Sequence, residues 1–176
     1  PNLNLIRPAD TVETAEAWDI ALKTNGPTVL ALSRQGLRAF RCEKSSENKV
    51  SKGGYLVNDI SSKRDLTLIA TGSEVEIAME ASELLNAEGI KASVVSLPCW
   101  ELFDKQDETY KKEILGNSPR IAIEAACDMG WSKYIGDNGV FIGMKNFGAS
   151  GPADQLYKHF GITSEAVVKQ ARSMIK

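Results

Sequence analysis

Residues 66–97 read LTLIATGSEVEIAMEASELLNAEGIKASVVSL, and this stretch decides the fold class. It opens and closes on aliphatic runs, residues 66–70 and 92–97, which have the length and composition of buried strands. Between the runs, small and apolar side chains recur at helical spacing: Val75, Ala78, Met79, Ser82 and Leu85. Gly89 follows the last turn, where a glycine commonly ends a helix. The pattern predicts a strand–helix–strand unit, the building block of parallel sheets.

The same alternation of strands and helices continues on both sides of this unit. Further strands are predicted over residues 55–57, 120–126 and 140–144, and further helices over residues 104–115, 131–135, 153–160 and 164–175. The strand at residues 55–57 is short and is expected at an edge of the sheet. We therefore predict an α/β fold, a three-layer sandwich with a mostly parallel five-stranded sheet, one antiparallel edge strand and helices on both faces.

The N-terminal residues carry a second strand–helix–strand pattern. Asp10, followed by Glu13 three residues later, predicts a capping box at the start of a helix. Residues 28–32 are β-branched and aliphatic, which predicts a buried strand. One such unit cannot cover both faces of a sheet, so we expect more strands before it. We interpret residues 1–40 as a remnant of another domain.

The segment that follows is polar. Residues 41–54 mix both charges and have almost no large apolar side chain, which is typical of a linker that runs over the surface. The predicted organisation is therefore a domain remnant over 1–40, a linker with the edge strand over 41–59, and the main domain over 60–176.

Composition excludes several classes of function. The chain has 21 Lys and Arg against 23 Asp and Glu, and this net charge of -2 gives no basis for binding nucleic acid or an anionic membrane. No apolar run is long enough to span a bilayer. Its three cysteines are scattered without C-x-x-C spacing, which predicts free thiols and a cytoplasmic location. With a single histidine, His159, expected at the surface, a zinc site is not predicted.

Arg34 is the main candidate for a binding residue. It comes just past the C-terminal end of the strand predicted over 28–32, and ligands of open α/β sheets bind at that edge. A guanidinium there suits a phosphate or a carboxylate, because its planar fork donates two parallel hydrogen bonds. The alternative is an arginine that closes a turn or pairs with a carboxylate of the protein.

A weaker candidate is an anion site at Gly72 and Ser73. These residues join a strand to a helix N-terminus, whose free N–H groups and dipole favour anions. The turn lacks the lysine and the further glycines of a P-loop. An ordinary serine cap, with Glu76 completing a capping box, is the alternative. The residues by themselves predict no catalytic group, no cofactor site and no metal site.

A series of motifs then resembles transketolases, in order and almost from end to end. They are R-P-A-D at 7–10, A-L-S-R-Q at 31–35, G-G-Y at 53–55, A-T-G-S-E-V at 70–75, F-D-K-Q-D at 103–107, W-S-K-Y at 131–134, F-G at 147–148, Ser150 and F-G-I-T at 160–163. The L-S-R-Q element with D-K-Q-D downstream is the most specific pair. Where the family often has Asn-Leu-Pro after that arginine and glutamine, this chain has Gly36-Leu37-Arg38.

The resemblance implies the end of a pyrimidine-binding domain followed by the small third domain of the family. Transketolases are homodimers that transfer a two-carbon ketol unit between sugar phosphates, using thiamine diphosphate and Mg or Ca. By this resemblance Arg34 binds the sugar phosphate. The family's cofactor, metal and catalytic residues lie in other parts of the enzyme, so we expect these residues alone to be inactive.

Two alternatives remain at this point. One is another thiamine-diphosphate enzyme, such as 1-deoxyxylulose-5-phosphate synthase or dihydroxyacetone synthase. The other is a free-standing regulatory or assembly domain that binds an anion at Ser73.

Overall fold

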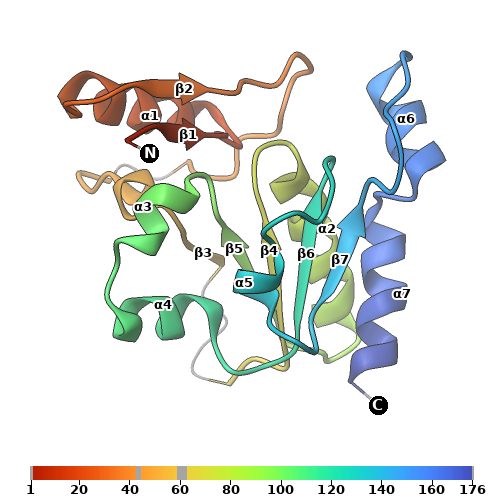
Figure 1. Cartoon of the computed structure of the whole chain (residues 1–176). Helices are drawn as coiled ribbons and strands as arrows, with labels where there is room; N and C mark the ends of the chain where they lie inside the picture. The colour runs from red at the N-terminus through yellow and green to blue at the C-terminus, as the bar shows by residue number, and fades with distance from the viewer. Residues whose placement is uncertain (1, 43–44, 59–62, 176) are drawn as a thin grey trace.

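The structure, a computed structural model, describes residues 2–42, 45–58 and 63–175. Its larger unit is a five-stranded sheet in the order β3-β5-β4-β6-β7, in which β3 is antiparallel to β5 and the other pairs are parallel (Figure 1). The strands are β3 (Tyr55–Asn58), β4 (Leu66–Ala70), β5 (Ala92–Ser96), β6 (Arg120–Glu124) and β7 (Val140–Gly143). The predicted sheet, with its antiparallel edge strand, is confirmed.

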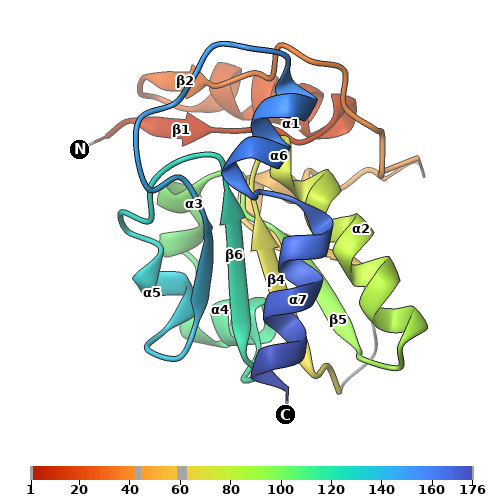
Figure 2. The same ribbon diagram turned by 90° about the vertical axis from the view of Figure 1, so that its right-hand side faces the viewer.

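Helices cover both faces of this sheet. The helices are α2 (Glu74–Ala87), α3 (Trp100–Asp104), α4 (Glu108–Leu115), α5 (Ser132–Ile135), α6 (Ala153–Phe160) and α7 (Ser164–Met174). On one face α2 and α7 lie side by side and bury apolar side chains against β4, β5 and β6 (Figure 2). On the other face α3, α4 and α5 enclose an aromatic core that contains Phe103, Trp131 and Tyr134. The three layers follow from strands that are apolar on both sides.

The helix predicted over 104–115 begins four residues later than predicted. Asp104 is the last residue of another helix, α3, and α4 begins at Glu108. The side chain of Asp107 accepts a hydrogen bond from the backbone N–H of Tyr110 at 2.8 Å, which is the geometry of an N-cap. Phe103, which is fully buried, fixes α3 one turn earlier. The prediction was wrong because charge alone does not locate a cap.

The smaller unit lies across the carboxyl ends of the larger sheet (Figure 1). It contains β1 (Asn4–Ile6), α1 (Thr11–Lys23) and β2 (Thr28–Leu30), with β1 parallel to β2. Half of the predicted capping box is present, since the Asp10 side chain accepts from the N–H of Glu13 at 2.8 Å, but the Glu13 carboxylate accepts from the N–H of Ala9 instead of that of Asp10. However, β2 is not a buried strand, because Val29 is 47% exposed. Within the described residues this sheet has only two strands and one helix, which leaves its outer face uncovered.

The predicted surface linker is partly wrong. Lys49–Lys52 forms a short 3-10 helix, η1, in which Val50 is fully buried against the small unit and Cys99. Gly53 follows with a φ of +79°, and a Cβ on it would lie 2.0 Å from the backbone nitrogen of Phe103. The segment escaped recognition because its packing depends on one apolar side chain, Val50, and on close backbone approach at Gly53. The division into domains stays a prediction, and its boundary at 59/60 lies outside the described residues.

Gly53→Ala tests this packing. The added methyl group would clash with backbone atoms that cannot move aside. The positive φ at this position is also one that residues other than glycine rarely adopt. We therefore expect the free energy of unfolding to fall by about 3 kcal/mol or more. Gly89→Ala is the matched control, because Gly89 has a φ of +83° with nothing within 4 Å of the added atom. It should lose only about 1 kcal/mol. Equal losses in urea unfolding would contradict a packed Gly53.

Candidate functional site

Arg34 lies where the sequence placed it, in the loop that leaves the carboxyl end of β2. Its side chain is exposed, and within the part of the chain that the structure describes no hydrogen bond or ion pair to its guanidinium is recorded. The alternative of an arginine paired with a carboxylate of the protein therefore finds no partner among these residues. An exposed guanidinium without a protein partner can donate its two parallel N–H groups to an anionic ligand.

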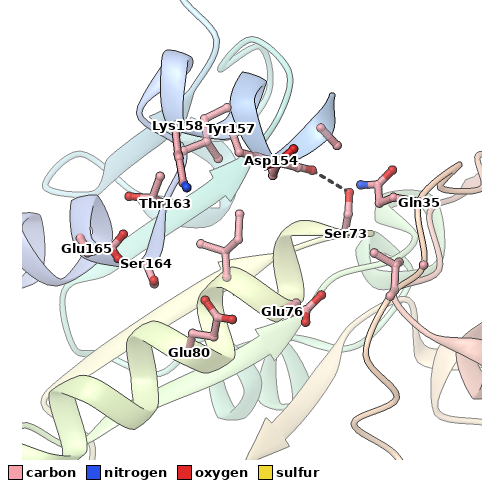
Figure 3. Close-up of a pocket in the computed structure, with 15 residues that line it drawn as sticks. Gln35, Ser73, Glu76, Glu80, Asp154, Tyr157, Lys158, Thr163, Ser164 and Glu165 are labelled. Atoms are coloured by element: carbon pink, nitrogen blue, oxygen red, sulfur yellow. Dashed lines mark hydrogen bonds between the residues drawn. The ribbon is translucent and has the colours of Figure 1, made fainter. Parts of the chain in front are cut away.

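A cavity of about 700 Å³ opens beside this loop (Figure 3). Gln35, Gly36 and Leu37 form one wall, the N-terminal half of α2 forms the floor, and α6 with the start of α7 forms the other wall. Its charged lining residues are mostly acidic: Glu76, Glu80, Asp154 and Glu165, against Lys158. This mostly acidic lining disfavours an anion inside the cavity.

The turn at Gly72 and Ser73 is built differently from the prediction. The Ser73 side chain makes no cap hydrogen bond, and the expected capping box with Glu76 is not formed. Instead the hydroxyl donates to the Glu74 carboxylate at 2.8 Å and lies 2.9 Å from the Tyr157 hydroxyl (Figure 3). An anion at Ser73 stays a prediction, and the adjacent carboxylate of Glu74 opposes it by like-charge repulsion.

Arg7 occupies the carboxyl edge of the larger sheet. Its guanidinium pairs with Glu74, the first residue of α2, at 3.2 Å and with Glu124, the last residue of β6. Tyr157 donates a hydrogen bond to Glu74, and the Trp131 indole donates one to Glu124 at 2.7 Å. In open α/β sheets this edge is where ligands bind. Here a residue of the smaller unit fills that position.

A buried carboxylate forms a second junction between the two units. Glu13 on α1 is fully buried and accepts hydrogen bonds from Ser96 at 2.6 Å, from Tyr55 at 2.7 Å and from the backbone N–H of Ala9 at 2.6 Å. Burial raises the pKa of Glu13 to about 7, because the charged form loses its hydration; the three hydrogen bonds act in the opposite direction.

Sequence reasoning missed the partners of Arg7. Glu124 was included in a predicted strand and Glu74 in a predicted helix, without a role for either. A usable signal was present, because each acid stands at or close after the carboxyl end of a buried apolar run, where side chains of different strands converge. Their pairing with Arg7, which is 67 and 117 residues away, was not readable.

Comparison with known proteins identifies the family to which this chain belongs. The family model described as the transketolase-like TK C-terminal domain matches residues 53–163, more than half of the chain. The chain belongs to this family. The match covers the five-stranded sheet and most of its helices, and the predicted resemblance is confirmed.

Relatives extend the likeness to the smaller unit. A transketolase of Sinorhizobium medicae is 53% identical over 100% of this chain and 26% of that protein. A chloroplastic transketolase of Solanum tuberosum is 50% identical over 99% of this chain and 24% of its own length. The solved structure of a transketolase from Leishmania mexicana superposes with a TM-score of 0.89 at 43% identity, covering 99% of this chain and 25% of that one. The chain thus spans about a quarter of the length of these relatives.

Three further observations bear on the expected cofactors and environment. Over residues 2–42, 45–58 and 63–175, no group of three or more His, Cys, Asp or Glu side chains is placed to hold a metal ion. Cys42, Cys99 and Cys127 are free thiols, as predicted. None of the helices in these ranges combines the length and the apolarity needed to cross a membrane.

The Glu13 junction predicts a pH dependence. The pKa of Glu13 is raised from 4.5 to about 7 in the folded chain, so its contribution to stability is complete below pH 4.5 and is lost as the pH rises through 7. Relative to Glu13→Gln, which cannot ionise, the unsubstituted chain should lose about 2–3 kcal/mol of unfolding free energy between pH 5 and pH 8. Urea unfolding at several pH values measures this difference. Parallel pH profiles for the two chains would contradict a buried, titrating Glu13.

Proposed function

We propose that this chain is the C-terminal part of a transketolase, an enzyme that transfers a two-carbon ketol unit from a ketose phosphate to an aldose phosphate. The observation that carries the proposal is the likeness to transketolases over 99% or more of the chain, at about 50% identity. This favours the transketolase reaction over that of a related synthase. Because these relatives are about four times longer, it also favours a part of an enzyme over a free-standing regulatory domain.

Thiamine diphosphate and Mg or Ca belong to this proposal for the intact enzyme. The cofactor supplies the carbanion chemistry when it is bound. The described residues offer no cluster of side chains for its metal ion, so we assign its binding and the catalytic residues to other parts of the enzyme. The role of this chain is then to bind substrate and to contact its neighbours, and alone it is expected to be inactive.

Arg34 is the residue that we assign to the substrate. Its exposed side chain at the carboxyl end of β2 is suited to the phosphate of a sugar phosphate, because a phosphate offers two oxygens to the two N–H groups of the guanidinium. The acidic lining of the adjacent cavity disfavours a second anion there.

The outer surface of the small unit is assigned to contacts within the assembled homodimer. Large apolar side chains of the small unit are exposed on α1 (Trp18 and Leu22), on the two strands (Leu5 and Val29) and just before β1 (Leu3). Trp18 and Leu22 are four residues apart on α1 and so share one face of the helix, which supports an interaction surface there. We further assign the protein to the cytoplasm, in keeping with its free thiols.

Arg34→Ala in the full-length protein that carries this chain tests the assignment. We expect transfer to a phosphorylated acceptor to fall by about 2–4 kcal/mol in kcat/KM, because a charge-assisted contact is lost. Transfer to the unphosphorylated analogue should stay within about twofold of the unsubstituted enzyme. Arg34→Lys, which keeps the charge without the fork, should lie between the two.

Two results would contradict the proposal. If both acceptors suffer equally from Arg34→Ala, Arg34 does not bind the phosphate. If the unsubstituted full-length protein transfers no ketol unit, the transketolase assignment itself is wrong.

A further inference from the structure

We infer that the ion pair between Arg41 and Glu16 positions the loop that carries Arg34, and that it thereby sets the affinity for the substrate phosphate. The inference rests on the proposed function. It concerns two residues that touch no substrate, so both are positioning residues. The loop in question runs over residues 31–41, from the end of β2 to Arg41.

The loop is fastened at its two ends. At the first end, the backbone N–H of Ala31 donates to the carbonyl of Ile6 at 2.9 Å, which continues the pairing of β1 with β2. At the second end, the backbone N–H of Arg41 donates to the Asp10 side chain at 3.2 Å. The Arg41 guanidinium also donates two hydrogen bonds to Glu16, at 2.8 Å and 2.7 Å.

Between these ends the loop is weakly held. Arg34 and Gln35 are exposed, and residues 31–40 include no helix or strand. The ion pair of Arg38 with Glu83 is long, at 3.8 Å, and both side chains are about 60% exposed, so it contributes little. Phe40 packs against the larger core beside the Arg41 anchor. The position of Arg34 therefore depends mainly on the two ends of the loop.

The Arg41 anchor is rigid as well as strong. The two side chains are only 11% and 12% exposed, and a bidentate pair of this kind is stronger and more directional than a surface pair. Two further hydrogen bonds fix the position of Glu16. Its carboxylate accepts from the backbone N–H of Val50 at 3.0 Å, and its backbone carbonyl accepts from the Asn48 side chain at 3.0 Å. The Arg41 guanidinium lies over the Tyr55 ring, 5.3 Å from its centre.

A loop that is released at one end samples more conformations. The entropy lost when substrate binding orders this loop is then larger, and the affinity is lower. Weakening the Arg41 anchor should therefore lower the affinity of Arg34 for the phosphate while the reacting groups stay in place. The expected signature is a higher KM for a phosphorylated acceptor with kcat little changed. An unphosphorylated acceptor, which makes no use of Arg34, should be unaffected.

The test compares variants of the full-length protein with a phosphorylated and an unphosphorylated acceptor. We expect Arg41→Ala to raise KM for the phosphorylated acceptor by about 5- to 30-fold and to leave the other acceptor within about twofold. Glu16→Gln should shift KM in the same direction. Arg41→Lys, which keeps the charge and loses the fork, should give a smaller shift.

Arg38→Ala is the matched control. It removes the same positive charge from the same loop, closer in sequence to Arg34, but it breaks only the exposed pair with Glu83. We expect it to leave both KM values within about twofold. An effect of Arg38→Ala as large as that of Arg41→Ala would show that net charge, not anchoring, governs phosphate binding, and would overturn the inference.

Hydrogen exchange supplies a readout that is independent of activity. In Arg41→Ala, the amides of residues 33–39 should exchange about tenfold faster, while those of β4 and β5 keep their rates. If Arg41→Ala fails to fold, Arg41→Lys and Glu16→Gln decide the question with the same measurements. Loss of phosphate discrimination in Arg34→Ala without any effect of Arg41→Ala overturns this inference alone. Intact discrimination in Arg34→Ala removes the proposed phosphate contact on which it rests.

Discussion

The guanidinium of Arg7, held between the carboxylates of Glu74 and Glu124, is the contact on which the arrangement of the two units depends. Glu74 is fully buried and Glu124 nearly so, and a buried carboxylate without a partner is strongly destabilising. The backbone of Arg7 adds two bonds to the same edge, since its N–H donates to the Pro98 carbonyl at 2.9 Å and its carbonyl accepts from Gly72 at 3.1 Å. The larger sheet thus uses its ligand-binding edge to hold a residue of the smaller unit.

This constraint explains why the proposed substrate contact belongs to the small unit. At the carboxyl edge of the five-stranded sheet Arg7 is already paired with Glu74 and Glu124, and these two carboxylates disfavour a phosphate there. The carboxyl end of β2 remains open and carries Arg34. Glu13 forms the second junction between the units, through Tyr55 on β3 and Ser96 on β5. The large unit therefore acts on the proposed site indirectly, by fixing the position of β1, α1 and β2.

The sequence predicted the strands and helices of the sandwich because strands buried on both faces must be continuously apolar, and LTLIA at 66–70 is such a run. Errors arose where tertiary contacts decide the local structure. Gly53 looked like part of a linker because the backbone it packs against lies about fifty residues further along the chain. The place of Arg34 was predictable from its distance to a strand end, whereas the Arg41 anchor was not, since no periodicity relates Arg41 to a carboxylate 25 residues earlier. Residue patterns predict which surfaces are buried, but they do not predict which charges meet across two units.

The most direct test of the central claim is hydrogen exchange of Arg7→Ala, with Lys23→Ala as the control for an exposed pair on the same unit. If Arg7 holds the two units together, the amides of α1 and β2 should exchange at least about tenfold faster in Arg7→Ala, while the central strands β4 and β5 remain protected. Lys23→Ala should change neither region, because its partner Asp19 is on the same helix and both side chains are largely exposed. Unchanged exchange in α1 and β2 of Arg7→Ala would contradict the claim and would assign the junction to the buried contacts of Glu13 and Val50 instead.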